Sequence, residues 1–385
     1  MIRMKIKDIC DLQNGRAFKP SDWGTAGLPI IRIQNLNDER APFNYYGGKY
    51  NLAQEVDNGD LLFSWSGTPG TSFGAFLWNR GKGVLNQHIF KVIPKVEVDK
   101  TYLMYALNGN ISTIISKAHG GVGLQHITKK ELDEIEIQMV SISRQKEIVE
   151  ILEKISLLIF LRKQQIVKLD ELVKARFVEM FGDPADNVNN LPASPMTAIC
   201  QIIDGDRGKN YPKQEEFSDS GFCLFLNAKN VTAQGFSFEN CTYITEEKDA
   251  LLRNGKLCRG DVVLTTRGTI GNLAFYDTSV PYENIRINSG MVILRMNKQV
   301  VSEIFFIEQF KMQLDSIKSR IASGSAQPQL PISTMNKIEM ILPPIELQNQ
   351  FSAFVERVDK QKQTVQQSLD KLELMKKALM QEYFG

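Results

Sequence analysis

Two kinds of hydrophobic pattern alternate along the chain. The first consists of short apolar runs separated by Gly, Pro and Asn turns, which is typical of β-strands. These runs lie at Leu28–Ile33, Asp60–Trp65, Ile89–Ile93, Phe222–Leu226, Asp261–Thr265 and Gly290–Leu294. Helical periodicity near Thr101–Ser116 and Ser302–Ile321 adds helices to them. The first pattern therefore predicts two regions of mixed α and β structure, both rich in strands.

The second pattern is a narrow apolar stripe with spacings of three and four residues, typical of a coiled coil. It runs without Pro or Gly from Ser143 to Phe181, and a similar stripe runs from Phe351 to Tyr383. A helix of about 38 residues spans roughly 57 Å. Gly182 and Gly385 are suitable stop signals. The predicted seam includes Ile148, Ile155, Leu169, Phe351, Val358 and Leu372.

The two halves of the chain resemble each other. Four pairs of segments align with an offset that drifts from 201 to 203 residues: Gly59–Gly70 with Gly260–Gly271, Asn86–Pro94 with Asn288–Met296, 121–137 with 324–340, and 168–182 with 371–385. A period of this length is too long for a solenoid. The chain is therefore a tandem duplication, in which each unit is a domain followed by a long helix.

We predict an α+β fold with internal pseudo-two-fold symmetry. Its parts are a first domain at 1–142, a long helix at 143–183, a second domain at 184–345 and a second long helix at 346–385. Two equivalent helices in one chain can pair with each other. Because the connection from 182 to 196 is short for a return path, we expect the pair to be antiparallel.

Composition narrows the class of protein. The 385 residues are 43% apolar and 23% charged, with a net charge of +2, an ordinary globular balance. The chain lacks the ~18 consecutive apolar residues of a membrane span and shows no signal-peptide core. Five cysteines without a CxxC spacing argue against disulfides and zinc. We expect a cytoplasmic, soluble protein without a membrane partner or a metal site.

No catalytic constellation is present. Clean matches to GxGxxG, GxxxxGK[ST], HExxH and GxSxG are missing. His88 aligns with Gly290 and His126 aligns with Gln329, so neither histidine is retained in the second copy. We therefore predict no catalytic residue.

Polar side chains suited to DNA cluster at turns in both copies. Asn and Gln pair well with adenine, Arg and Lys pair with guanine, and hydroxyl groups contact phosphates. The alternative is that these segments are ordinary solvated loops. The candidates are Arg32, Gln34, Asn35, Ser64, Ser66, Thr68, Asn86, Gln87, Gln125, Asn227, Lys229, Asn230, Thr265, Arg267, Thr269, Arg286, Asn288 and Gln327.

Three features together resemble the specificity subunit of type I restriction–modification systems. The first is the Gly-Asp-hydrophobic-hydrophobic element that ends in Gly-x-x-Gly, at Gly59–Gly70 and Gly260–Gly271. The second is the hinge before each helix, Ile135–Ile148 and Ile338–Gln348, although the first copy has Val140 and Ser141 in place of prolines and neither copy has a Glu before the Gln. The third is the aromatic-Gly ending of each helix. The resemblance covers essentially the whole chain.

The resemblance implies a non-catalytic subunit with two target recognition domains. Each would read one half of a split sequence in double-stranded DNA, while the paired helices fix the unread spacer. Two modification (methyltransferase) subunits would dock on this subunit and supply the S-adenosylmethionine site. Restriction subunits can add ATP- and Mg-dependent activity. The resemblance therefore implies that this chain itself needs no cofactor. The competing interpretation is a coiled-coil adaptor that binds proteins only. A stand-alone nuclease or methyltransferase is disfavoured by the missing motifs.

Overall fold

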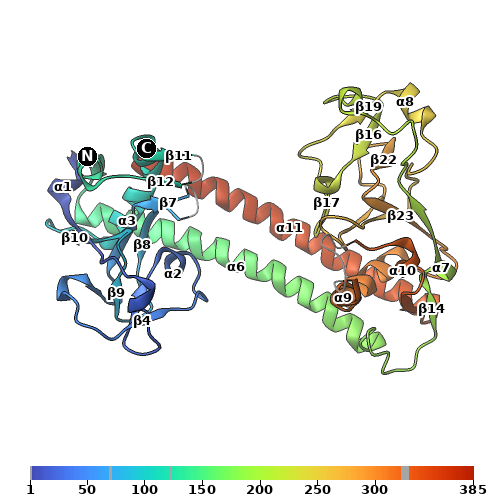
Figure 1. The fold of residues 1–385 in the computed structure, drawn as a ribbon, viewed down its shortest axis with the longest axis horizontal. Helices are drawn as coiled ribbons and strands as arrows, with labels where there is room; N and C mark the ends of the chain where they lie inside the picture. The colour runs from blue at the N-terminus through green and yellow to red at the C-terminus, as the bar shows by residue number, and fades with distance from the viewer. Residues whose placement is uncertain (1, 69–71, 122–123, 322–328) are drawn as a thin grey trace. The chain divides into compact units, whose positions relative to one another are not determined.

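The computed structural model describes residues 2–68, 72–121, 124–321 and 329–385. Its internal contacts divide the chain into two compact units, Met1–Lys163 with Gln366–Gly385, and Gln164–Val365. Each unit contains one strand-rich domain together with a part of each long helix (Figure 1). The units therefore differ from the sequential repeats, because each long helix is shared between them.

The first domain is built on two four-stranded sheets. One has the order β2-β10-β6-β8 and the other the order β4-β3-β9-β5, in which β3 and β9 are parallel. Two smaller sheets pair β1 with β13 and join β11, β12 and β7. The strands are β1 Ile2–Lys5, β2 Cys10–Asn14, β3 Leu28–Ile31, β4 Asn44–Tyr46, β5 Glu55–Val56, β6 Leu61–Ser64, β7 Ser66–Gly67, β8 Gly74–Leu77, β9 Gly83–Leu85, β10 Ile89–Pro94, β11 His119–Gly121, β12 Leu124–His126 and β13 Glu136–Met139. The helices are α1 Ile6–Ile9, α2 Ile33–Asn37, α3 Lys100–Gly109, α4 Ile111–Ser116 and α5 Lys129–Asp133.

The second domain has the same plan. Its four-stranded sheet has the order β15-β23-β20-β21, and a second sheet, β19-β16-β22, contains the parallel pair β16–β22. The strands are β14 Ala193–Pro195, β15 Cys200–Asp204, β16 Cys223–Leu226, β17 Val231–Thr232, β18 Gly235–Phe236, β19 Tyr243–Ile244, β20 Asp261–Thr265, β21 Leu273–Phe275, β22 Ile285–Ile287, β23 Met291–Met296 and β24 Glu339–Ile341. The helices are α7 Met196–Ile199, α8 Glu246–Leu251, α9 Glu303–Ile321 and α10 Ile332–Met335.

The duplicated Gly-Asp element has the same structure in both copies. Gly59 and Gly260 adopt φ angles of +81° and +96°, which favour glycine. The following aspartates each pair with a cation on the neighbouring strand, Asp60 with Lys91 at 2.7 Å and Asp261 with Arg295 at 2.8 Å. The sequence repeat is therefore also a repeat of structure.

The strands that follow this element are buried on both faces. In β6, Phe63 contributes to the apolar cluster that also holds Ile148, whereas Leu62 contributes to a separate cluster with Trp78. Because both faces of the strand are covered, it reads as a continuous apolar run rather than an alternating one.

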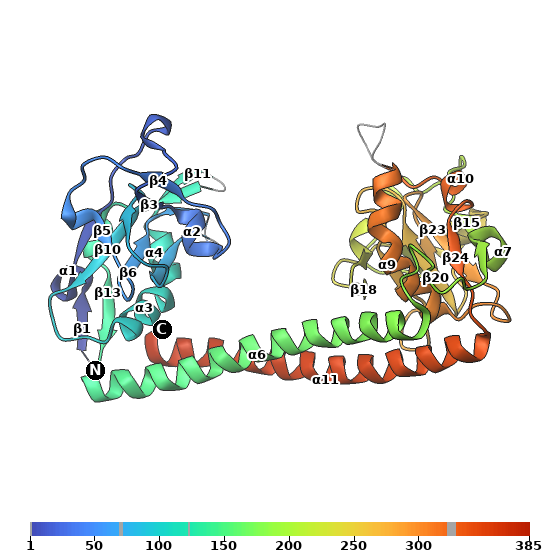
Figure 2. The same ribbon diagram turned by 90° about the horizontal axis from the view of Figure 1, so that it is seen from below.

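The two long helices are α6, Ile142–Phe181, and α11, Ile345–Phe384, and they pair antiparallel (Figure 2). In the first unit, Lys163 Nζ lies 2.8 Å from a carboxylate oxygen of Glu373. In the second unit, the rings of Phe177 and Phe351 are 5.3 Å apart. Residue numbers thus rise along α6 as they fall along α11, which confirms the predicted orientation.

The predicted seam positions are shielded from solvent to different degrees. Leu372 is half-buried, and the other five are buried, namely Ile148, Ile155, Leu169, Phe351 and Val358. The C-terminal end of α11 also completes the first domain. The Phe384 ring lies 5.3 Å from that of Tyr102, and a Cβ on Gly109 would meet Phe384 at 2.5 Å. Among the described residues, no helix has the length and apolar character needed to cross a membrane.

Candidate nucleic-acid interface

In the first domain, the ends of three strands bring polar side chains together. Arg32 follows β3 and Asn86 follows the parallel strand β9, and the Asn86 N–H donates to the Ile31 carbonyl at 3.0 Å. The Arg16 N–H, just after β2, donates to the Leu85 carbonyl at 2.8 Å. We call Arg16, Arg32, Asn86 and the adjacent Gln87 the first edge.

The second domain repeats this arrangement with different side chains. Asn227 follows β16 and Asn288 follows the parallel strand β22, and the Asn288 N–H donates to the Leu226 carbonyl at 3.2 Å. The Arg207 guanidinium donates to the Ser289 carbonyl at 3.2 Å. The N–H of Arg267 donates to the next carbonyl, that of Gly290, also at 3.2 Å. We call Arg207, Asn227, Arg267 and Asn288 the second edge.

A glycine packs against each edge. A Cβ on Gly15 would lie 2.1 Å from the Asn86 carbonyl oxygen, and one on Gly205 would lie 2.3 Å from the Asn288 carbonyl oxygen. Neither position can therefore accept a side chain while the backbone stays in place. This close approach holds the chain segment that carries Arg16 or Arg207 against the strand-end asparagine.

Aromatic rings and amides extend the first edge. The amide nitrogen of Gln87 lies 3.1 Å from His88 Nε2, and the His88 ring is 5.1 Å from that of Trp65. Burial lowers the pKa of His88. Gln125 on β12 is the antiparallel strand partner of Gly67 on β7, which comes two residues after Trp65 in the sequence. The first edge thus continues into a surface of uncharged hydrogen-bonding groups.

Most of the DNA-contact candidates from the sequence are exposed or half-buried. Those at the two edges are Arg32, Asn86, Gln87, Asn227, Arg267 and Asn288, and those elsewhere on the two domains are Gln34, Thr68, Gln125, Lys229 and Thr269. Gln327 lies outside the described residues. The remaining candidates are buried.

Asn35 and Asn230 are buried and close equivalent turns. The Asn35 side chain accepts from the Arg32 N–H at 3.0 Å and donates to the Ala41 carbonyl at 3.2 Å. Asn230 makes the corresponding bonds in the second domain. Ser64, Ser66 and Thr265 are also buried, with hydroxyl–backbone bonds for Ser64 and Thr265. Their position does not support contact with bases, because a short polar side chain at a turn satisfies the local backbone instead.

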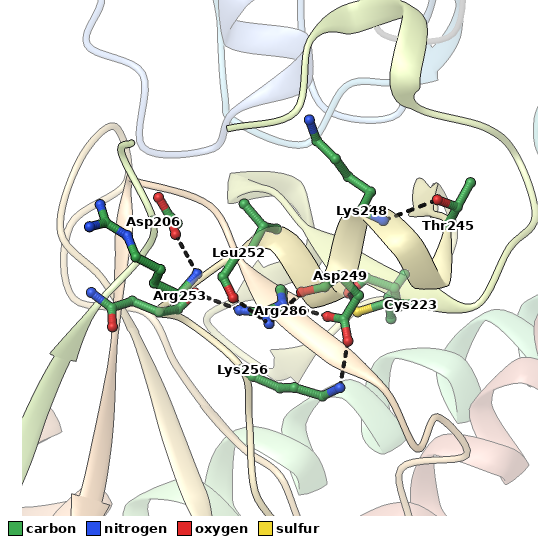
Figure 3. A network of polar contacts seen from close by, with 11 residues as sticks. Asp206, Cys223, Thr245, Lys248, Asp249, Leu252, Arg253, Lys256 and Arg286 are labelled. Carbon is green, nitrogen blue, oxygen red and sulfur yellow. Dashed lines mark hydrogen bonds and ion pairs between the residues drawn. The ribbon is translucent and has the colours of Figure 1, made fainter. Parts of the chain in front are cut away.

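Arg286 is also buried, and Figure 3 shows its guanidinium at the centre of a polar network. Its Nε donates to the Asp249 carboxylate, and its Nη2 donates to the Asp249 and Leu252 carbonyls at 2.8 and 3.1 Å. Asp249 also receives a bond from Lys256. Although burial opposes ionisation, these cations leave the pKa of Asp249 lowered. Arg286 therefore holds α8 and the loop after it to β22, and its position does not support the predicted DNA contact.

Two arginines of the edges were missed by the sequence analysis. Arg16 directly follows Gly15, and Arg207 comes two residues after Gly205. The signal was a glycine followed closely by arginine at the end of the first long strand in each copy. Sequence alignment of the two copies did not reach these segments, so the signal was overlooked.

The described ranges contain no group of three or more His, Cys, Asp or Glu side chains arranged to hold a metal ion. What the two edges offer is a set of hydrogen-bond donors and acceptors with several guanidinium groups. Such groups suit base edges and phosphates.

Comparison with known proteins decides the family. Two segments of the chain, residues 3–171 and 196–374, match the model of the Type I restriction modification DNA specificity domain. The chain belongs to this family. Each matched segment covers one strand-rich domain and most of the long helix after it, so the DNA specificity domain is present twice.

Curated relatives agree with this assignment, and two solved structures share the fold. The type I restriction enzyme MjaVIII specificity subunit of Methanocaldococcus jannaschii is 24% identical, over 84% of this chain and 78% of the relative. The EcoBI specificity subunit of Escherichia coli is 21% identical, over 93% of this chain and 79% of the relative. The crystal structure of the type I S subunit from M. genitalium has a similar fold, with a TM-score of 0.56 and 17% sequence identity. The match covers 100% of this chain and 96% of the M. genitalium chain. A structure from a study of type I complex assembly is similar with a TM-score of 0.60 and 13% sequence identity. This match covers 100% of this chain and 97% of the other chain.

The protein is therefore a DNA specificity subunit of a type I restriction–modification system, and it is not itself the catalyst. This agrees with the absence of a catalytic constellation in its sequence.

Proposed function

We propose that each domain of this specificity subunit reads one half of a split DNA target through its edge. The observation that carries the proposal is that the two domains share the same backbone arrangement at their edges but differ in the side chains that it presents. Asn86 and Asn288 occupy equivalent strand ends, and each is packed against by a glycine. Around them, the side chains differ between the copies.

The differences alter the hydrogen-bonding pattern of each edge. Gln87 and His88 of the first domain correspond to Ser289 and Gly290 of the second. An amide and an imidazole place donors and acceptors on planar groups, whereas a serine hydroxyl has one rotating donor and glycine has no side chain. Because each base pair shows a distinct pattern in the major groove, two different edges select two different half-sites.

The paired helices set the separation between the half-sites. Their seam is apolar, with Leu169 and Val358 buried, and ion pairs such as Lys163–Glu373 border it. A helix pair packed in this way resists bending and sliding better than a flexible linker of the same length.

The outer faces of the helices bind two modification subunits. In the first unit, α6 exposes four large apolar side chains within five residues, namely Leu157, Leu158, Phe160 and Leu161, at 56, 43, 56 and 50%. In the second unit, a groove of about 940 Å³ between α6 and α11 is lined by Leu172, Arg176 and Phe354, among others. Clustered exposed apolar groups on a helix are typical of protein interfaces. The modification subunits bring S-adenosylmethionine chemistry, and restriction subunits join them with ATP-dependent activity.

A selection experiment tests the proposal. The full chain, alone and together with candidate modification subunits, is incubated with random-sequence duplex DNA, and bound fragments are sequenced. We expect two short defined elements separated by a constant unread spacer. If no sequence is enriched although the proteins form a complex, the coiled-coil adaptor interpretation is correct instead.

A further inference from the structure

Arg16 at the first edge rests on two aromatic rings. Its guanidinium carbon lies 4.9 Å from the ring centroid of Tyr46 and 5.4 Å from that of Phe18. The two rings contact each other edge to face, with centroids 5.1 Å apart. A guanidinium over aromatic rings is held in place by attraction to the π-faces.

Hydrogen bonds fix one side of the same guanidinium. Arg16 Nη1 donates to the Tyr46 hydroxyl oxygen at 2.9 Å and to the Lys49 carbonyl at 3.1 Å, and the Tyr46 hydroxyl donates to that same carbonyl at 3.1 Å. Gly48 makes room for this arrangement, because a Cβ there would meet the Tyr46 hydroxyl at 2.5 Å. The Gly47–Gly48 turn therefore seats the tyrosine that orients Arg16.

The rest of the guanidinium remains available. Within the described part of the chain, Arg16 has no carboxylate partner, and its Nε and Nη2 atoms have no hydrogen-bond acceptor. Arg286 and Arg295, in contrast, are each bonded to an aspartate. An arginine held in one orientation without a counter-charge is prepared to meet an acceptor from outside the protein.

The second domain lacks this arrangement. The residue that follows Gly205 is Asp206, which is buried and accepts hydrogen bonds from the N–H groups of Gly208 and Arg253. Burial alone would raise the pKa of Asp206, but these backbone bonds leave it lowered. A role for Arg16 in recognition would therefore concern the first half-site alone.

We propose that Arg16 determines specificity in the first half-site by reading a guanine. Its two free donors, Nε–H and Nη2–H, match the N7 and O6 acceptors that guanine presents in the major groove. A guanidinium fork also pairs with a phosphate, so the test below separates a base contact from a phosphate contact. This inference rests on the proposed function of the first edge.

The test uses the same selection from random duplex DNA, with the full chain and its modification subunits. Arg16→Lys keeps the positive charge but loses the two-donor fork, and Tyr46→Phe keeps Arg16 but removes the hydroxyl that orients it. Lys49→Gln is the matched control, since it removes an exposed charge from the same loop. Melting temperatures establish that each variant is folded.

We expect Arg16→Lys to lose preference for guanine at one position of the first half-site by about tenfold. Tyr46→Phe should weaken the same preference, whereas Lys49→Gln and the second half-site should keep theirs. Replacing that guanine with 7-deazaguanine, which lacks the N7 acceptor, should weaken binding by the wild type and not weaken Arg16→Lys further.

Two results would overturn the inference. An equal loss of affinity for all sequences, with a shallower salt dependence, would make Arg16 a phosphate contact. An unchanged first half-site would remove it from the interface. Either result leaves the proposed function standing if the wild type still selects a split target, whereas a wild type that selects no sequence refutes the proposed function itself.

Discussion

Gln145 and Gln348 make the same connection in the two halves of the molecule. Gln145 Oε1 accepts from the Asp99 N–H at 2.9 Å, and Gln348 Oε1 accepts from the Ser302 N–H at 3.0 Å. Both amide nitrogens donate to backbone carbonyls just before the helix. Both side chains are buried, with 1% and 0% exposed. Each glutamine thus ties the start of a long helix to its own domain.

Replacing Gln348 with Leu should destabilise the protein by about 1–3 kcal/mol, because the Ser302 N–H and the carbonyl partners lose their hydrogen bonds while they remain buried. Urea unfolding measures the change. Gln361→Leu makes the same chemical change at an exposed position of α11 and should leave the stability nearly unaltered. Equal effects of the two variants would show that the buried contact has no special importance.

Leu169 and Leu172 distinguish the seam from the outer face of α6. Leu169 is 9% exposed and Leu172 is 47% exposed. Leu169→Asp places a charge in the apolar seam. We therefore expect the free energy of unfolding to fall by several kcal/mol and the binding of modification subunits to be lost. Leu172→Asp should keep the melting temperature and weaken the binding of a modification subunit. Comparable melting temperatures for the two variants would contradict the assigned packing.

Arg267 and Arg286 should behave differently although both were candidates for DNA contact. Arg286→Met removes one cation from the buried Asp249 and leaves Lys256 beside it, so the free energy of unfolding should fall by at most about 3–5 kcal/mol. Arg267→Ala removes an exposed side chain, so stability should stay the same while specificity relaxes in the second half-site alone. Thermal unfolding and selection from random DNA measure the two effects. A change at both half-sites in Arg267→Ala would refute its placement at the second edge.

Acid should weaken a surface contact of the first domain. Lys5 and Lys7 each donate to the Glu134 carboxylate at 2.6 Å and lower its pKa from 4.5 to about 2. Since the folded pKa is depressed, the stabilisation is present above pH 4.5 and is lost as the pH falls towards 2. The stability difference between wild type and Glu134→Gln should therefore shrink over this range. A stability difference that stays constant over this range would contradict the assigned ion pairs of Glu134.

The periodic parts of the fold could be predicted from the sequence. The three-and-four spacing of residues such as Ile148 and Leu169 placed both long helices within a few residues of their ends, because a long seam repeats its signal many times. The internal repeat predicted two equivalent domains, and the strand topology confirms them. The antiparallel pairing followed from the short connection between the first helix and the second domain.

The site was less predictable because burial of a polar residue depends on distant partners. Arg286 comes two residues before Asn288 in the sequence, but its partner Asp249 is 37 residues away. Asn35 looks like a base-reading amide, yet its side chain closes a turn with Ala41. The sequence did not single out Arg16, because the residue that orients it, Tyr46, lies 30 residues away along the chain.

The central claim is that the paired helices set the unread spacer between the half-sites. Inserting one heptad after Gln165 and another after Ser368 keeps the seam in phase and lengthens the pair by ~10 Å. At 3.4 Å per base pair, the preferred spacer should grow by roughly three base pairs, while both half-sites stay unchanged. The longer helices also change the rotation between the two domains, and twisting the DNA to match them can lower the affinity. Sequencing the fragments that this variant binds measures spacer and half-sites together: a spacer longer by about three base pairs supports the account, and an unchanged spacer contradicts it.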